Sequence, residues 1–442
     1  MRGGAMQTEA VKPSPGFGPD FLKFWAGQTI SNLGSSFTAF ALPLLVYKLT
    51  GSALDLAITT ASTFLPYALF GLFIGALVDR SDRRRMMIIT DILRALVIAA
   101  IPLVAALGWL AVGWIYLISF LISVLTIFFN AGEFTAVPSL VGPEQLVAAN
   151  GRIQASYSAA GIAGPILAGV LVAIAPLETV LYVDAASFLI SALSLWLIRA
   201  SFGGGQTAGS SLLAEVGVGL RYMLRNPVLR DLCIMVALFN LVGSTIGAQL
   251  VYFAKRQLGA NDSQWAFFAA AGGVGVIILS LLAGSLRQRL PFSKVALGAL
   301  TLYSLLNIGF AFTAAYWPAL LIWSLMSGLG VLFNINVISL FQAMVPQELM
   351  GRIMSVATTL VWSAIPIGSF IGGYFIEVSG NIALVFAVIG VASLLIAVGF
   401  AFTSLGHAED YLPTEAKAGQ GKAQPLLVEE AASEAEELFV NR

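Results

Sequence analysis

Charged side chains are scarce in this chain. Only 10% of its 442 residues are Asp, Glu, Lys or Arg, whereas 58% are hydrophobic, and a soluble domain has about 25% charged residues. The formal net charge is zero, and no basic stripe is present, which argues against a nucleic-acid partner. This composition excludes a water-soluble fold and indicates a protein embedded in lipid.

Cysteine and histidine occur once each. Cys233 lies in an apolar run, which excludes a disulfide within the chain and a thiolate metal cluster. His407 lies in a polar segment without a second imidazole or a carboxylate cluster, so a zinc or di-iron site lacks ligands. We therefore expect no metal and no other cofactor. The chain also lacks the clustered acids, histidines or activated serine of an intramembrane enzyme.

Apolar runs dominate what is present, and a membrane-spanning helix needs about 20 such residues. The polar stretch before the first run is rich in Gly and Pro, so we expect no cleavable leader there. The sequence therefore predicts an all-α membrane protein with twelve transmembrane helices. Their expected spans are 22–47, 54–78, 86–108, 112–130, 150–174, 179–198, 228–254, 263–286, 292–314, 318–340, 350–376 and 381–404.

The distribution of Lys and Arg predicts the orientation. If both termini are cytoplasmic, the outer loops contain only Lys48, Lys255 and Arg256 as basic residues. Cytoplasmic loops retain positive charge, so this arrangement agrees with the rule for membrane proteins. We expect a multi-pass protein of the cell (inner) membrane with both ends in the cytoplasm.

A long polar break divides the helices six and six. The expected parts are an N-terminal segment 1–20, a first bundle 21–200, a linker 201–227, a second bundle 228–404 and an acidic cytoplasmic tail 405–442. The bundles carry a partial repeat, because Gly151-Arg152-Ile153 and Gly351-Arg352-Ile353 each open the fifth helix of a half. Two related bundles place a substrate site between them near the membrane midplane.

Apolar residues in the linker, including Leu213, Val216 and Leu220, have helical spacing. They predict an amphipathic helix that lies either on the inner membrane surface or against the underside of the protein. We expect the tail to be disordered because it is polar and acidic. A short docking helix around Leu427 and Leu438 is the alternative.

The loop after the second span contains Gly75, Asp79 and Arg80, followed by clustered arginines. Gly75 permits close approach of a helix, and Asp79 can accept hydrogen bonds at a helix N-terminus. The loop resembles the signature loop of the major facilitator superfamily, although basic residues here could also be a simple cytoplasmic anchor. The resemblance implies that Asp79 meets the helix near Gly351 and Arg352 and closes the cytoplasmic side.

Glu133 lies near the end of the fourth span, on the same side as the loop arginines. The resemblance implies that this acid pairs with Arg83 or Arg84, with a geometry that suits a guanidinium. A solvated acid at a helix end is the alternative. The gate is thus expected to comprise Gly75, Asp79, Arg80, Arg83, Arg84 and Glu133.

The fifth span contains small residues at wide spacing. Gly151, Gly164, Pro165 and Gly169 resemble the antiporter motif of the superfamily, with Ala160 and Ala168 in place of two glycines. Small residues let a membrane helix pack closely, and a proline permits a bend. The resemblance implies export by exchange.

Four ionisable residues fall in or near apolar spans: Asp55, Asp91, Arg94 and Asp184. Such residues are costly in lipid and are candidates for ion coupling. Asp91 and Arg94 are three residues apart, so they share a helix face and are expected to form a structural ion pair. Asp184 could carry a proton or could stabilise the first turn of a helix.

Amides in the first, seventh and tenth spans are candidates for the substrate cavity. Amides among aromatic residues suit an uncharged or amphiphilic ligand, although each amide could instead bridge two helices. The candidates are Gln28, Asn32, Asn240, Gln249, Asn334 and Asn336.

Several phrases narrow the resemblance, among them Ser31-Asn32-Leu33-Gly34 and Asp184-Ala185-Ala186-Ser187-Phe188. They are similar to the branch that includes enterobactin exporters and macrolide-efflux permeases. The resemblance implies export of a lipophilic drug-like compound or siderophore, driven by the proton gradient, and we expect a monomer. Ser36 and Glu133 depart from the branch's usual residues. A lipid or lysophospholipid flippase and a transport-inactive sensor are the alternatives.

Overall fold

The computed structural model describes residues 17–79, 81–200, 202 and 212–411. Within these residues twelve helices are long and apolar enough to cross a membrane, which confirms the predicted fold class. The first six are α1 Pro19–Thr50, α2 Ala53–Asp79, α3 Arg83–Ala106, α4 Val112–Leu140, α5 Leu146–Ile174 and α6 Thr179–Trp196. The second six are α8 Pro227–Ala248, α10 Asp262–Arg289, α11 Phe292–Ala311, α12 Tyr316–Met344, α13 Gln347–Ser379 and α14 Ile382–Ala401.

Local sequence signals set several helix ends. Gly51 and Gly380 follow α1 and α13 with φ angles of +62° and +63°, a conformation that glycine adopts without the steric cost of a Cβ atom. Asn226 caps α8 through the N–H groups of Val228 and Leu229, and Asn261 begins α10 with a reciprocal capping box. These residues turn the chain sharply between spans.

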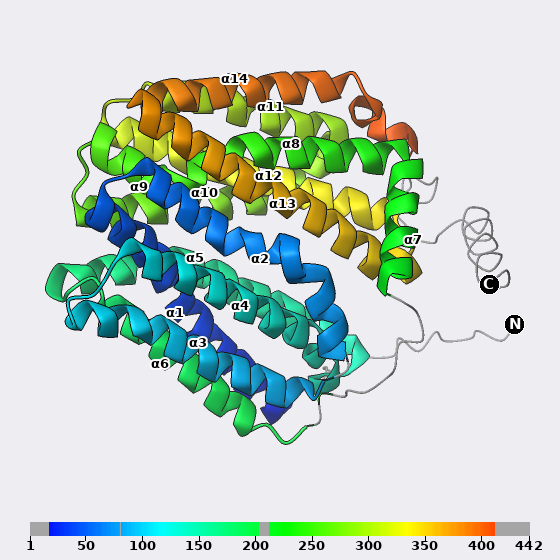
Figure 1. Ribbon diagram of the computed structural model, residues 1–442. Coiled ribbons are helices and arrows are strands. Elements are labelled where there is room, and N and C mark those ends of the chain that lie inside the picture. Colours follow the sequence, from blue (N-terminus) through cyan, green and yellow to red (C-terminus); the bar gives the residue numbers. More distant parts are fainter. Residues whose placement is uncertain (1–16, 80, 201, 203–211, 412–442) are drawn as a thin grey trace, which may run out of the picture.

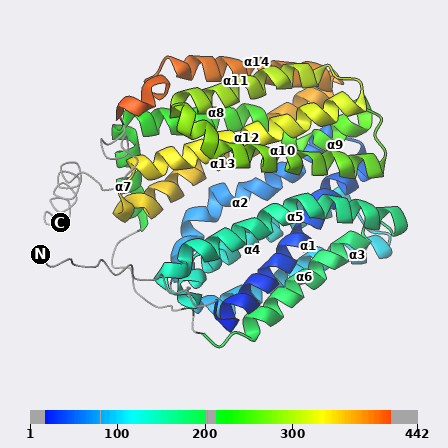
Figure 2. The same cartoon turned by 180° about the vertical axis from the view of Figure 1, so that it is seen from behind.

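The helices form two groups that lie one above the other in Figure 1 and, from behind, in Figure 2. In the first group α1 packs against α5 and α6, and α4 packs against α2 and α3. In the second, α12 packs against α10 and α11, and α14 packs against α11. The main contacts between the groups are α2 with α13 and α5 with α10, so these two helix pairs form the bundle interface.

The hydrophobic core differs between the two ends of the molecule. At the end that carries the α1–α2 and α13–α14 turns, one buried cluster includes Phe40 and Leu45 of the first bundle with Val251 and Trp265 of the second. At the opposite end each bundle has its own buried clusters. We call these the outer and inner ends. Among the residues that the structure describes, the bundles therefore share a buried core only at the outer end.

Two further helical segments lie at the inner end (Figure 1). The linker helix α7, Leu212–Arg225, packs against α13 and α8, with Met223 buried and Tyr222 Oη donating to Met344 O at 3.1 Å. This is the packed alternative rather than a helix lying free on the membrane. Short segments Pro143–Gln145, Leu250–Tyr252 and Phe253–Gln257 connect other spans.

The start of the acidic tail is ordered, contrary to the expectation of disorder from residue 405. Residues Ser404–Tyr411 form a helical segment, η3, with Leu405 fully buried. Glu409 accepts hydrogen bonds from the Ser293 N–H and Oγ at 2.7 and 2.5 Å, so it caps the first turn of α11. The proposed docking helix around Leu427 and Leu438 lies outside the described residues.

Candidate functional site: a closed outer gate and a central cavity

Glu377 of α13 joins the two bundles at the outer end. Its Oε2 accepts hydrogen bonds from Ser52 Oγ at 3.1 Å, from Ala53 N at 2.9 Å and from Leu54 N at 3.4 Å. The N–H groups at the start of α2 have no partner within the helix, and a carboxylate there is favoured by the helix dipole. Glu377 therefore acts as a cap supplied by one bundle to the other.

Two further polar contacts cross the bundle interface at this end. Asp262 of α10 lies between Lys48 of α1, at 2.5 Å, and Lys255 of its own bundle, at 2.6 Å. The fully buried Gln249 donates from Nε2 to Ala53 O at 2.7 Å. These described contacts between the two bundles all lie at the outer end. We call these contacts the outer gate.

The outer gate was not predicted from the sequence. One signal for it was present, because Glu377 lies in the last turn of its helix, where the helix dipole disfavours a carboxylate. Such a residue needs a partner elsewhere. The sequence alone does not identify that partner as the start of α2, more than three hundred residues earlier in the chain.

A cavity of about 300 Å³ lies among α2, α8, α11, α12 and α13. Its aromatic walls include Phe64, Phe239 and Trp362. The Trp362 ring also packs against the rings of Phe64 and Tyr67. Asn240 and Asn334 supply amides, as the sequence analysis expected for these two residues. The exposed Asn334 has no hydrogen-bond partner among the described residues. The remaining lining residues are Val236, Leu300, Tyr303, Leu329, Gly330, Phe333, Val361 and Ile365.

The other amide candidates do not line this cavity. Gln28 donates to Ser191 Oγ at 3.0 Å and so joins α1 to α6, and Gln249 belongs to the outer gate. Asn336 is fully buried and bonds Leu332 O of its own helix at 2.7 Å. Asn32 Nδ2 is buried without a partner among the described residues. The expected contribution of α1 to the cavity is therefore absent in this conformation, because its Gln28 faces α6.

Buried charges are concentrated in the first bundle. Asp91 and Arg94 of α3 form the expected salt bridge, with Asp91 at 0% and Arg94 at 5% exposure. The Arg94 guanidinium also lies 4.2 Å from the ring centre of Phe129 and 4.5 Å from that of Phe188. The negative faces of these two aromatic rings attract the cation electrostatically, so Arg94 links α3, α4 and α6.

Two more acids meet hydroxyl groups from neighbouring helices. Asp184 of α6, at 1% exposure, accepts hydrogen bonds from Thr38 of α1 and from Ser187, the latter at 3.2 Å. Asp184 lies within α6 rather than in its first turn, so it does not cap the helix. Asp55 of α2 accepts from Tyr116 Oη of α4 at 2.5 Å. Both carboxylates are thus held by hydroxyl groups rather than by cations.

The loop between α2 and α3 does not show the expected pairing. Glu133 Oε2 accepts from Tyr157 Oη of α5 at 3.1 Å, and Oε1 has no partner. Arg84 instead donates to Leu195 O at 2.9 Å and Trp196 O at 2.5 Å, and Arg83 donates to Phe202 O at 3.3 Å. Neither arginine pairs with Glu133, and Arg84 instead satisfies carbonyl groups at the end of α6, where the last turn of a helix leaves them without an internal partner.

The rest of the expected inner gate is not described by the structure. The side chains of Asp79 and Arg352, the surroundings of Gly75 and Gly351, and the whole of Arg80 lie outside what the structure describes. Their contact remains a prediction.

The glycines of α5 have different surroundings. A Cβ atom on Gly164 would lie 2.0 Å from Ser36 Oγ of α1, and one on Gly169 would lie 2.2 Å from Ala266 Cβ of α10. No atom lies within 4 Å of such a Cβ on Gly151. Pro165 lies inside the helix. Gly164 thus permits packing within a bundle and Gly169 permits packing between bundles, whereas Gly151 permits no contact here.

Comparisons with known proteins agree with this architecture. The chain is 27% identical to macrolide efflux protein A of Streptococcus pyogenes over 365 residues, with 81% of this chain and 89% of that protein covered. It is 28% identical to the multidrug efflux pump Tap of Mycolicibacterium fortuitum over 382 residues, with 82% and 90% covered. Among solved structures, the nucleoside transporter NupG superposes with a TM-score of 0.72 at 13% identity, covering 86% of this chain and 98% of that chain.

A bacterial homologue of the iron transporter ferroportin in an inward-facing state superposes with a TM-score of 0.66 at 18% identity, covering 87% of this chain and 98% of that chain. At these identities the structural comparisons show the fold alone. The family model described as "transmembrane secretion effector" matches residues 14–429. The chain therefore belongs to the transmembrane secretion effector family, a group of transporters within the major facilitator superfamily.

Proposed function

We propose that this protein exports a small hydrophobic or amphiphilic molecule, such as a macrolide-like drug or a siderophore, across the cell (inner) membrane by proton antiport. The central cavity is the observation that carries the substrate class. Its walls are mainly aromatic and aliphatic, its polar groups include the amides of Asn240 and Asn334, and no charged residue lines it. A site of this kind binds an apolar body and orients it with a few hydrogen bonds.

The direction of transport rests on the two curated relatives, whose names describe efflux. The proposed transport mechanism rests on how the hydrophobic core is distributed between the two ends. A hydrophobic core shared at the outer end, with separate cores at the inner end, is the arrangement of a transporter that is closed outside and able to open inside. Export then requires the outer gate to break and an inner contact to replace it.

The substrate class can be tested by measuring the accumulation of a radiolabelled macrolide in cells with and without the protein. Expression should lower accumulation, and a protonophore should abolish the difference. Asn334→Ala should restore accumulation at least partly, because it removes the free amide of the cavity. Asn150→Ala, the same change on an exposed part of α5, is the matched control.

A result in which the protein lowers macrolide accumulation equally with and without the proton gradient would contradict antiport. If accumulation is unaffected while fluorescent lysophospholipid moves between leaflets of proteoliposomes, the protein is a flippase. No flux of either compound would favour a transport-inactive sensor.

The orientation proposed here places the inner end, with α7 and η3, in the cytoplasm. Its support is the basic residues of the inner segments, because cytoplasmic segments retain Lys and Arg. Reporter fusions at Gly16 and after His407 should both give cytoplasmic signals. A periplasmic signal from either fusion would reverse the assignment of the inner and outer ends.

A further inference from the structure

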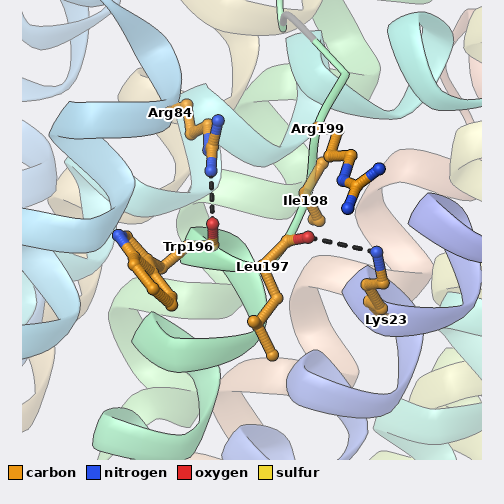
Figure 3. Close-up of a pocket in the computed structure, with 6 residues that line it drawn as sticks. All are labelled: Lys23, Arg84, Trp196, Leu197, Ile198 and Arg199. Atoms are coloured by element: carbon orange, nitrogen blue, oxygen red, sulfur yellow. Dashed lines mark hydrogen bonds between the residues drawn. The ribbon is translucent and has the colours of Figure 1, made fainter.

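A second cavity lies at the inner end of the first bundle, away from the central cavity. It has a volume of about 520 Å³ and is lined by Lys23 of α1, Arg84 of α3, and Trp196, Leu197, Ile198 and Arg199 at the end of α6 (Figure 3). Nothing in the transport mechanism uses it. We call it the basic pocket.

The basic pocket has an excess of positive charge. Lys23 Nζ lies 2.9 Å from Asp20 Oδ1 and donates to Leu197 O at 3.1 Å. Asp20 Oδ2 is already occupied, because it accepts from the backbone N–H groups of Arg199 and Ala200 at 3.1 and 3.0 Å. The lining therefore carries three basic residues and no acidic one, and the neighbouring Asp20 has both carboxylate oxygens engaged.

Hydrogen-bond donors are left over in the basic pocket. Arg84 bonds the α6 carbonyls through Nε and Nη2 only, which leaves Nη1 for another acceptor. The guanidinium of Arg199 is exposed and has no partner among the described residues. Figure 3 shows the side chains of Arg84, Arg199 and Lys23 arranged around the end of α6. Two guanidinium groups and an ammonium group suit a phosphate.

An apolar surface leads from the basic pocket along the outside of the bundle. Trp196 is 65% exposed, and Leu193 and Leu189 above it on α6 are 54% and 51% exposed. On the adjoining α3, Ile89 and Leu96 are exposed to a similar degree. A soluble anion would leave this apolar surface uncovered, whereas the acyl chains of a lipid would cover it. A tryptophan at this height is also typical of the membrane interface.

We propose that the basic pocket binds the phosphate headgroup of an anionic phospholipid from the inner leaflet, with its acyl chains against α3 and α6. The proposal rests on the cytoplasmic orientation of the inner end but not on the transported substrate. Basic pockets between membrane helices on this side are suited to anionic headgroups. The bound lipid would neutralise Arg199 and hold the ends of α1, α3 and α6 together.

Native mass spectrometry of the purified full-length protein can test this proposal. The probes are phosphatidylglycerol and phosphatidylcholine added at matched concentrations, with inorganic phosphate and glycerol phosphate as soluble anions. Phosphatidylglycerol should bind in preference to phosphatidylcholine, and neither soluble anion should displace it at millimolar concentration. Arg199→Gln should weaken phosphatidylglycerol binding about fivefold, the effect expected for one basic residue at an anionic membrane surface.

Arg289→Gln is the matched control, because it removes the same charge from an exposed site at the inner end of the second bundle. Arg289→Gln should leave phosphatidylglycerol binding unchanged. Equal losses in the two variants would show non-specific charge attraction and overturn the proposal. Displacement of the lipid by inorganic phosphate would make the pocket a soluble-anion site and would also overturn it. Because no step requires transport, these outcomes are independent of the proposed export activity.

Discussion

Asp184 has the surroundings expected of a proton carrier. It is buried at the contact of α1 and α6, and its carboxylate is held by the hydroxyl groups of Thr38 and Ser187 rather than by a cation. Asp91, in contrast, is tied to Arg94 in a salt bridge. An acid held only by hydroxyl groups can become neutral without leaving an unpaired buried cation. We therefore place Asp184 ahead of Asp91 as a coupling residue, with Asp55 as the second candidate.

Asp184→Asn should abolish export against a gradient and spare downhill movement of substrate. Asparagine keeps the shape of the side chain and can still accept from Thr38, but it cannot bind and release a proton. Substrate flux in proteoliposomes, with and without an imposed pH difference, measures both activities. Asp231→Asn, at the inner end of the second bundle, is the control. Uphill export by Asp184→Asn, Asp55→Asn and the double variant would move coupling to Glu133 or Asp91.

Single residues show what the sequence could and could not predict about the site. The Asp91 and Arg94 pair was predictable, because a spacing of three residues on a helix fixes their proximity. It was harder to predict which amides face the cavity. Asn334 and Asn336 are two residues apart, yet one faces a cavity and the other is fully buried. Which amide faces the cavity depends on the rotation of α12 against its neighbours, and composition does not encode that rotation.

The pairing of α2 with α13 is the element on which the closed outer end depends. A Cβ atom on Gly373 of α13 would lie 2.3 Å from Ala57 Cβ and 3.0 Å from Ala53 O of α2. The same pair of helices meets further in, where the rings of Tyr67 and Trp362 are 4.8 Å apart. Close approach of two membrane helices requires small residues at the contact, and here glycine and alanine supply them.

Gly373→Ala should separate the outer ends of α2 and α13 and shift the protein away from the closed outer end. Overpacking of a tight contact costs about 1–3 kcal/mol, so the ratio of conformations should change at least about fivefold. Hydrogen–deuterium exchange at the outer ends of both helices measures the change. Gly399→Ala on α14, where a Cβ would meet nothing within 4 Å, is the control. Equal exchange in both variants would mean that the contact tolerates a methyl group.

At the level of helices, the sequence predicted most of the fold. Long apolar runs separated by polar turns were sufficient to place the spans, because lipid requires each one to satisfy its own backbone hydrogen bonds. Contacts between distant helices were not predictable in the same way. The cap that Glu377 provides to α2 and the bond from Gln249 to Ala53 both join residues that are far apart in the chain.

For the whole molecule, the proposed transport cycle requires two alternative sets of contacts between the bundles. The outer set is present, with Glu377 on the start of α2 and Lys48 against Asp262. The inner set is the predicted contact of Asp79 with the start of α13. The Glu377 cap and the predicted Asp79 contact use the same helix pair, α2 and α13, and in each an acid at the end of one helix caps the start of the other. A ligand or mutation that weakens one set favours the other.

The most direct test of the exchange between the two gates is to remove the Glu377 cap and to measure the separation of the bundles at both ends. Spin labels at Ala111 and Ala314 report the separation of the bundles at the outer end, and labels at Asn150 and Arg289 report it at the inner end, in a background with Cys233→Ala. Glu377→Ala loses a helix cap worth about 1 kcal/mol, or about fivefold in the ratio of conformations. Glu178→Ala, an outer acid whose side chain caps no helix, is the control.

Double electron–electron resonance on each label pair gives the two distance distributions. If the two gates exchange, Glu377→Ala should lengthen the outer distance and shorten the inner distance in the same fraction of molecules, while Glu178→Ala should change neither. Unchanged distances at both ends, or a change at the outer end with none at the inner end, would contradict the exchange of gates on which the account depends.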